Sequence, residues 1–136
     1  MINSNLVDNI KYSEGFSNTL YMDDKNNATI GYGTNINKIS KKEAELLLMN
    51  RITNSISEVD AIIGYTGISN MNERQRDSLY ELCYWIGASK FQKFVKMIKA
   101  IRESNFNKAS EELLDSKLAR EYTTRANRLA HGLRDY

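Results

Sequence analysis

The sequence predicts a mainly helical α+β protein with a small β-hairpin near its N-terminus. Between Gly15 and Gly33, helical periodicity disappears and turn-forming residues gather at 23–27, between two short segments of strand-forming residues. From residue 40 onward, apolar residues recur at helical spacing through most of the chain. A β element confined to the N-terminal quarter and followed by helices is typical of the α+β class.

A short helix is expected before the hairpin. Its apolar positions are Leu6, Val7 and Ile10, and it starts near Asn3–Asn5. Gly15 is expected to end this helix and to let the chain turn into the hairpin, because glycine tolerates the left-handed conformations common at helix ends.

The longest expected helix covers residues 40–63. Ser40 and Glu43 fit a capping box, in which a hydroxyl and a carboxylate each satisfy a free backbone donor. Apolar residues then follow at helical spacing for about six turns. Shorter helices are expected at residues 72–87, along the apolar stripe of Phe91, Phe94, Val95, Ile98 and Ile101, and near residues 108–114 and 124–133.

Composition narrows the class of protein. The 136 residues are 41% hydrophobic and 26% charged, as in ordinary globular domains, and their formal net charge is +2. Residues 1–87 carry 8 basic and 11 acidic side chains, whereas residues 88–136 carry 11 basic and 6 acidic ones. We interpret the lysines at positions 90, 93, 96 and 99 as a solvated face, with attraction to an anionic polymer as the alternative.

The small numbers of cysteine and histidine residues argue against several kinds of catalytic and metal site. Cys83 is the single cysteine and lies in an apolar run, where a buried, unreactive thiol is expected. His131 is the single histidine, which leaves little basis for a catalytic triad or a zinc site of several histidines. We expect no metal and no cofactor, so the remaining chemistry rests on carboxylates, hydroxyls and arginines.

The sequence shows no targeting segment and no apolar run of membrane-spanning length. We therefore expect a protein of the cytoplasm that stays there until something else releases it. Stable membrane association is not expected.

Three polar side chains near the hairpin form a candidate site: Glu14, Asp23 and Thr29. The turn between Asp23 and Thr29 would place these two across the hairpin from each other, beside the end of the first helix. A carboxylic acid facing a carboxylate and a hydroxyl is the arrangement that an inverting glycosidase uses. Acidic side chains near a turn are most often simply solvated, so this spacing alone does not establish a site.

Several segments of the chain occur in the order and spacing of a known family. They are Glu14-Gly15-Phe16, Tyr21, Asp23, Thr29-Ile30-Gly31-Tyr32-Gly33, the capping box with its leucine-rich helix, Tyr84-Trp85-Ile86-Gly87 and Arg125-Ala126-Asn127-Arg128. Together they resemble the phage-type lysozymes, glycoside hydrolase family 24, and the resemblance covers nearly the whole chain.

The resemblance implies a lysozyme-like fold with two lobes. Residues 1–136 would form a single domain with an N-terminal α+β lobe at 1–39, a connecting helix at 40–63 and a helical C-terminal lobe at 64–136. The cleft between the lobes would hold the glycan.

The resemblance also implies an activity. The protein would be an endolysin that hydrolyses, with inversion, the β-1,4 bond between N-acetylmuramic acid and N-acetylglucosamine in peptidoglycan, and so lyses bacteria. Glu14 would be the general acid, with Asp23 and Thr29 positioning the attacking water. Arg125 would reach from the C-terminal lobe to Glu14, or else is simply a first-turn arginine of the last helix. By family analogy, a holin pore would release the enzyme to the wall.

Two positions depart from the family pattern. Thr34 stands where many members have a histidine, and the acid that pairs with that histidine is replaced near Arg51, which is expected to affect stability rather than chemistry. Trp85 stands where relatives often carry an amide side chain, so it fills the core, stacks on a sugar or blocks part of the cleft. Tyr32 and Trp85 are candidate substrate-binding residues.

Other functions remain as alternatives. A catalytically silent lysozyme-like module would bind peptidoglycan or another protein, and a lytic transglycosylase would need the acid but no held water. A nucleic-acid site on the basic C-terminal half is the third alternative, although no recognised motif supports it. The expected partner is a peptidoglycan strand rather than nucleic acid, and the expected state is a monomer.

Overall fold

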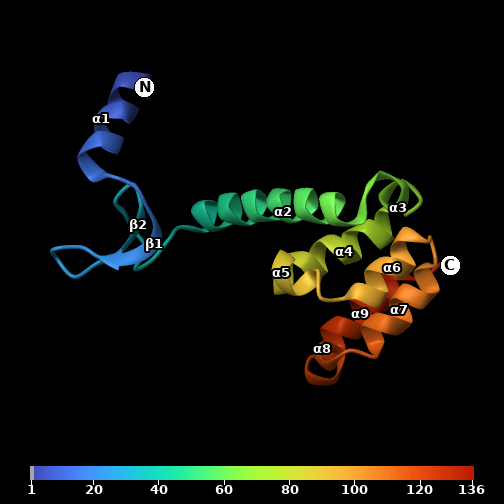
Figure 1. Cartoon of the computed structure of the whole chain (residues 1–136). Helices are drawn as coiled ribbons and strands as arrows, with labels where there is room; N and C mark the ends of the chain where they lie inside the picture. The colour runs from blue at the N-terminus through green and yellow to red at the C-terminus, as the bar shows by residue number, and fades with distance from the viewer. Residues whose placement is uncertain (1) are drawn as a thin grey trace. The chain divides into compact units, whose positions relative to one another are not determined.

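The computed structural model describes residues 2–136 and confirms the mainly helical α+β class (Figure 1). The chain divides into two compact units, Met1–Leu46 and Leu47–Tyr136, which we call the first and the second unit. Within residues 2–136, no helix combines the length and the apolar character that a membrane crossing needs.

The first helix, α1 (Ser4–Glu14), begins and ends on local signals. The Asn3 side chain accepts a hydrogen bond from the Leu6 N–H at 2.9 Å. Gly15 follows the helix at φ 68°, and its N–H donates to the Lys11 carbonyl at 2.9 Å. The expected helix is therefore confirmed, including the glycine that ends it.

The predicted hairpin is confirmed and has a third strand. An antiparallel sheet is formed by β1 (Ser17–Met22), β2 (Ala28–Gly31) and β3 (Thr34–Asn35), in that order. The third strand was not predicted, because a strand of two residues after a glycine-containing turn has no alternating pattern to detect.

The long helix α2 (Lys41–Ile63) begins on the predicted capping box. The Ser40 N–H donates to Glu43 Oε1 at 3.1 Å, and the Glu43 N–H donates to Ser40 Oγ at 3.1 Å. Gly64 follows the helix at φ 90°. The capping-box prediction therefore holds at the level of individual atoms.

The first unit has almost no buried side chains. Between residues 2 and 46, Thr29 is the only buried residue, at 3% exposure. Apolar side chains of α1 and β1 are exposed, among them Leu6, Ile10, Leu20 and Met22. Hydrogen bonds of turns and caps, rather than an apolar core, therefore define the local structure of this unit.

The second unit is helical throughout. After the end of α2 it contains α3 (Tyr65–Ser69), α4 (Glu73–Ile86), α5 (Ala88–Phe91), α6 (Val95–Arg102), α7 (Phe106–Leu114), α8 (Lys117–Glu121) and α9 (Thr123–Leu133).

The helices α4, α7 and α9 confirm three of the expected segments, and α5 and α6 correct a fourth. The stripe expected along 91–101 is divided between α5 and α6, and Val95 is 68% exposed, so it does not belong to the apolar face. The five-residue helices α3 and α8 were not predicted, because they are too short to show a period.

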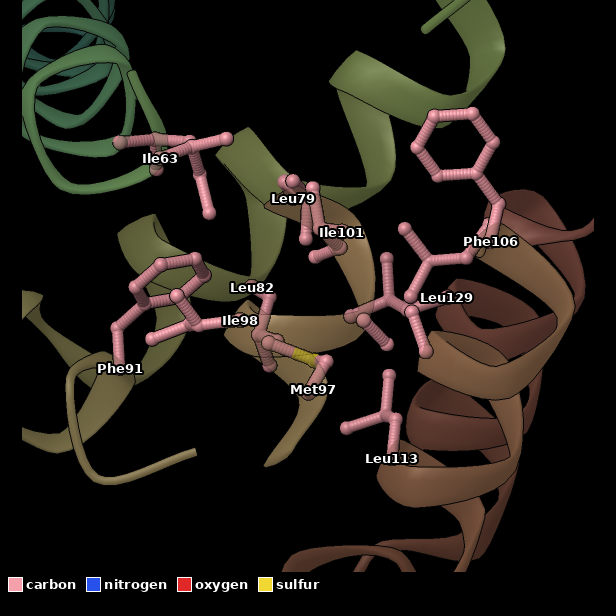
Figure 2. Close-up of a cluster of buried hydrophobic side chains, with 14 of the residues drawn as sticks. Ile63, Leu79, Leu82, Phe91, Met97, Ile98, Ile101, Phe106, Leu113 and Leu129 are labelled. Carbon is pink, nitrogen blue, oxygen red and sulfur yellow. The ribbon is translucent and has the colours of Figure 1, made fainter. Parts of the chain in front are cut away.

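The core of the second unit lies among the end of α2 and the helices α4, α5, α6, α7 and α9 (Figure 2). Large apolar side chains from these helices meet there, including Leu79, Leu82, Phe91, Met97, Ile101, Leu113 and Leu129. Cys83 is in the same cluster at 1% exposure, and burial raises the pKa of its thiol. The predicted burial of Cys83 is confirmed, and its low reactivity stays a prediction.

Candidate functional site

Glu14 is the last residue of α1, and its carboxylate lies against the turn between β2 and β3. A Cβ atom placed on Gly33 would collide with the carboxylate of Glu14. Gly33 also has φ 72°, a left-handed conformation that disfavours other residues. The backbone conformation of Gly33 therefore favours glycine, and a side chain at this position would displace the Glu14 carboxylate.

An aromatic contact accompanies the approach of α1 to this turn. The rings of Phe16 and Tyr32 lie 5.2 Å apart between centroids, and the Lys11 ammonium lies 5.3 Å from the centre of the Tyr32 ring. Tyr32 is thus engaged by residues of its own unit. Its role in binding substrate stays a prediction.

Asp23 is the residue around which the β1–β2 turn folds. Its Oδ1 accepts hydrogen bonds from the backbone N–H groups of Lys25 at 2.9 Å and Asn27 at 2.8 Å. These hydrogen bonds, with the one from Asn27 N–H contributing most, hold the pKa of the Asp23 carboxyl below its usual value. Asp23 is therefore an anion over the whole neutral pH range.

Thr29 lies opposite Tyr21 in the pairing of β1 with β2. Asp23 comes two residues after Tyr21, and its N–H donates to the Asn27 carbonyl at 3.0 Å, so Asp23 and Thr29 are diagonal neighbours on one face of the hairpin. The sequence analysis placed these two residues across the hairpin from each other, and the register refines that placement to a diagonal.

Asn27 is bound by both of these candidate residues, and the sequence analysis did not single it out. The Thr29 hydroxyl donates to the Asn27 carbonyl at 2.9 Å, while Asp23 accepts from the Asn27 N–H. The Asn27 amide Nδ2 donates to Asp23 Oδ2 at 3.3 Å. The single signal available in the sequence was the asparagine pair in the turn, which also fits a plain turn former.

Arg125 lies in the first turn of α9 and is bound within the second unit. Its Nε donates to Glu81 Oε2 at 3.0 Å, and Arg128 donates to the same oxygen. Hydrogen bonds from Arg128 and then Arg125 lower the pKa of Glu81. The position in α9 agrees with the first-turn interpretation, and the expected contact of Arg125 with Glu14 stays a prediction.

Trp85 packs against the core of the second unit and is half-buried. The Arg125 guanidinium lies 4.6 Å from the centre of its ring, and Tyr122 meets the ring edge-on at 5.7 Å. One face of the indole is therefore covered by a cation. The role of Trp85 in binding sugar stays a prediction.

Glu81 was also missed by the sequence analysis. Its ion pair with Arg125 joins residues 44 positions apart, which no local pattern indicates. Both side chains line a hollow of about 380 Å³ within the second unit, together with Leu48, Ile52, Ile56, Asp77, Tyr80 and Tyr84.

In the described part of the chain, no group of three or more His, Cys, Asp or Glu side chains is placed to hold a metal ion. Lys90, Lys93, Lys96 and Lys99 are exposed, and no ion pair formed among residues 2–136 includes them. These four lysines fit the solvated face favoured from the sequence.

Comparison with known proteins gives two matches. A profile described as phage lysozyme matches residues 11–134, which include Glu14, Asp23, Thr29 and Arg125. A protein of Dictyostelium discoideum described as "Probable T4-type lysozyme 2" is 28% identical over 155 aligned positions, covering 93% of this chain and 91% of that protein.

Proposed function

Because the chain belongs to the phage lysozyme family, we propose that it is a muramidase that hydrolyses the β-1,4 bond between N-acetylmuramic acid and N-acetylglucosamine in peptidoglycan. One observation carries the proposal. The Asp23 carboxylate and the Thr29 hydroxyl both bind Asn27, and the Glu14 carboxylate lies against Gly33 of the same sheet. All three residues of the family motif belong to the first unit, which supports the proposal.

Asp23 and Thr29 are suited to hold a water molecule for attack. Because the Thr29 hydroxyl gives its proton to the Asn27 carbonyl, its oxygen is left as an acceptor. The ionised Asp23 is an acceptor as well. A water that donates one hydrogen to each residue keeps its oxygen lone pairs free to attack the anomeric carbon.

In this proposal Glu14 donates its proton to the glycosidic oxygen as the bond to the leaving sugar breaks. The water attacks the opposite face of the ring and passes a proton to Asp23, which inverts the anomeric configuration. The net reaction consumes one water and yields a new reducing end. A lytic role, in which the enzyme leaves the cytoplasm through a membrane pore before it meets the wall, belongs to the same proposal.

Lysis of permeabilised Gram-negative cells by the purified protein tests the proposal, measured as loss of turbidity beside Glu14→Gln. Released fragments are analysed by mass spectrometry, and thermal melting verifies that the variant folds. Lysis by the parent alone, with reducing-end products, supports a muramidase that acts through Glu14.

Two other outcomes would overturn the proposal in different ways. Anhydro-sugar products would identify a lytic transglycosylase instead. A folded parent that binds purified wall and releases no reducing ends would identify a silent binding module.

A further inference from the structure

Three side chains next to the sheet form a continuous row of hydrogen bonds that ends on Asp23. The Ala28 N–H donates to Asn37 Oδ1 at 3.3 Å, and Asn37 Nδ2 donates to Asn27 Oδ1 at 3.1 Å. Asn27 Nδ2 then donates to Asp23 Oδ2 at 3.3 Å. We call Asn27 and Asn37 the asparagine relay.

The relay has one direction. An ionised carboxylate only accepts hydrogen bonds, so Asn27 must present its amide N–H to Asp23 and its carbonyl to Asn37. For the same reason Asn37 presents its amide N–H to Asn27, and its carbonyl then faces the backbone donor of Ala28. Each bond is consistent with the next, which favours mutual polarisation along the row.

The backbone holds Asn37 beside this row. The Ile36 N–H donates to the Ala28 carbonyl at 2.8 Å, directly after β3. The Asn37 N–H donates to Asn35 Oδ1 at 2.9 Å. The third strand and the residues after it therefore place the start of the relay.

The two oxygens of Asp23 have different surroundings. Oδ1 accepts two backbone hydrogen bonds, from Lys25 and Asn27, at 2.9 and 2.8 Å. Oδ2 accepts only the longer bond from the relay in the described structure. Since each carboxylate oxygen accepts about two hydrogen bonds, Oδ2 is the oxygen with capacity for a water.

We propose that Asn27 and Asn37 are positioning residues, which orient Asp23 Oδ2 toward the attacking water although Asn37 does not touch Asp23. The consequence for catalysis rests on the proposed function. The effect of the relay on the Asp23 carboxyl does not, so the two can be tested separately.

The test compares Asn37→Asp with Asn35→Asp. Asn37→Asp keeps the acceptor for Ala28 but places a second acceptor against Asn27, which then turns its amide N–H away from Asp23. Asn35→Asp adds the same charge two residues away and keeps the acceptor for the Asn37 N–H. Both variants carry the added charge, and only Asn37→Asp reverses the direction of the relay.

The first readout is the Asp23 carboxyl titration followed by NMR in the full chain. The other ionisable side chains of the turn and of β1 are Asp24, Lys25 and Tyr21, and all of them are unchanged in both variants. We expect a higher titration midpoint in Asn37→Asp than in Asn35→Asp. Equal midpoints would overturn the proposal.

The second readout is kinetic. We expect kcat of Asn37→Asp to fall about ten-fold or more, with KM within about two-fold of the parent, because misplacement of a reacting group costs rate rather than binding. Asn27→Ser, too short to reach Asp23 Oδ2, should show the same split, and adding Asn37→Asp to it should change kcat no further.

The measurements distinguish a failure of the asparagine relay from a failure of the proposed function. If the parent hydrolyses peptidoglycan while Asn27→Ser keeps its kcat and Asn37→Asp keeps its Asp23 midpoint, the relay is wrong and the proposed function stands. If the parent hydrolyses nothing but the midpoint moves only in Asn37→Asp, the relay stands and the proposed function is wrong.

Discussion

The two units of this protein are held by different interactions. In the second unit 17 buried residues form a continuous apolar core, whereas in residues 2–46 a single threonine is buried. The first unit nevertheless carries the three motif residues: Glu14 at the end of α1, Asp23 in the β1–β2 turn and Thr29 in β2. Hydrogen bonds to Asn27 fix Asp23 and Thr29. From this difference we expect substitutions in the first unit to change mainly activity. Substitutions in the second unit should change mainly stability.

The largest expected effect is that of Glu14→Gln on activity. If Glu14 is the general acid, as proposed, its loss should lower kcat/KM by roughly 10²- to 10⁴-fold, measured on soluble peptidoglycan fragments. The melting temperature should stay unchanged, because Glu14 is exposed. A Glu14→Gln variant that lost its fold together with its activity would contradict the expectation that substitutions in the first unit act mainly on activity.

Truncation of a core side chain should give the largest effect on stability. Leu129 is 1% exposed, and Leu129→Ala should lower the free energy of unfolding by about 2–5 kcal/mol. The matched truncation in the first unit is Met22→Ala, at a side chain that is 53% exposed, and it should change that free energy by less than about 0.5 kcal/mol. Urea unfolding measures both, and equal losses would contradict the contrast.

Substitution of two glycines, one in each unit, separates an effect on stability from an effect on activity. Gly33 and Gly64 have φ of 72° and 90°, so alanine at either position should cost about 1–2 kcal/mol of stability. Only Gly33→Ala brings a methyl group against the Glu14 carboxylate, since the space around Gly64 is open. We therefore expect Gly33→Ala alone to reduce hydrolysis, measured at a temperature where both variants are folded. Equal activity would mean that the methyl group does not displace the Glu14 carboxylate from a position that the reaction needs.

Acid should weaken the β1–β2 turn. The folded-state pKa of Asp23 is lowered, so its contribution to stability is fully present above about pH 4 and is lost as pH falls through the lowered value. Asp23→Asn should remove this part of the pH dependence, followed by NMR of the turn between pH 2 and pH 6. Asp24→Asn is the control, because the hydrogen bonds of this turn go to Asp23. A parent turn that stays intact at the lowest pH would contradict the expectation. This is the smallest of the four effects.

Local signals in the sequence predicted the parts of the fold that depend on neighbouring residues. The capping box at Ser40 and Glu43, the glycine that ends α1 and the hairpin all involve residues within a few positions of one another. The division between α5 and α6 was not predictable from apolar spacing, because Val95 fits the period and yet faces solvent.

The residues that the sequence did not reveal in either unit depend on contacts between distant positions. Asn37 lies ten residues from Asn27, and Glu81 lies 44 residues from Arg125. In the sequence, an asparagine near a turn and a glutamate on a helix are both common surface residues. The motif residues could be named from a resemblance. Asn37 and Glu81 could not, because their contacts depend on the register of the sheet and on the packing of α4 with α9, respectively.

The burial of Cys83 has a practical consequence for spectroscopy. A thiol that is 1% exposed and has a raised pKa reacts slowly with reagents that require a thiolate. A cysteine introduced at an exposed position of either unit would then be the one fast-reacting thiol of the chain. Fluorophores or spin labels can thus be attached at chosen sites while the native side chain stays in the core and continues to stabilise it.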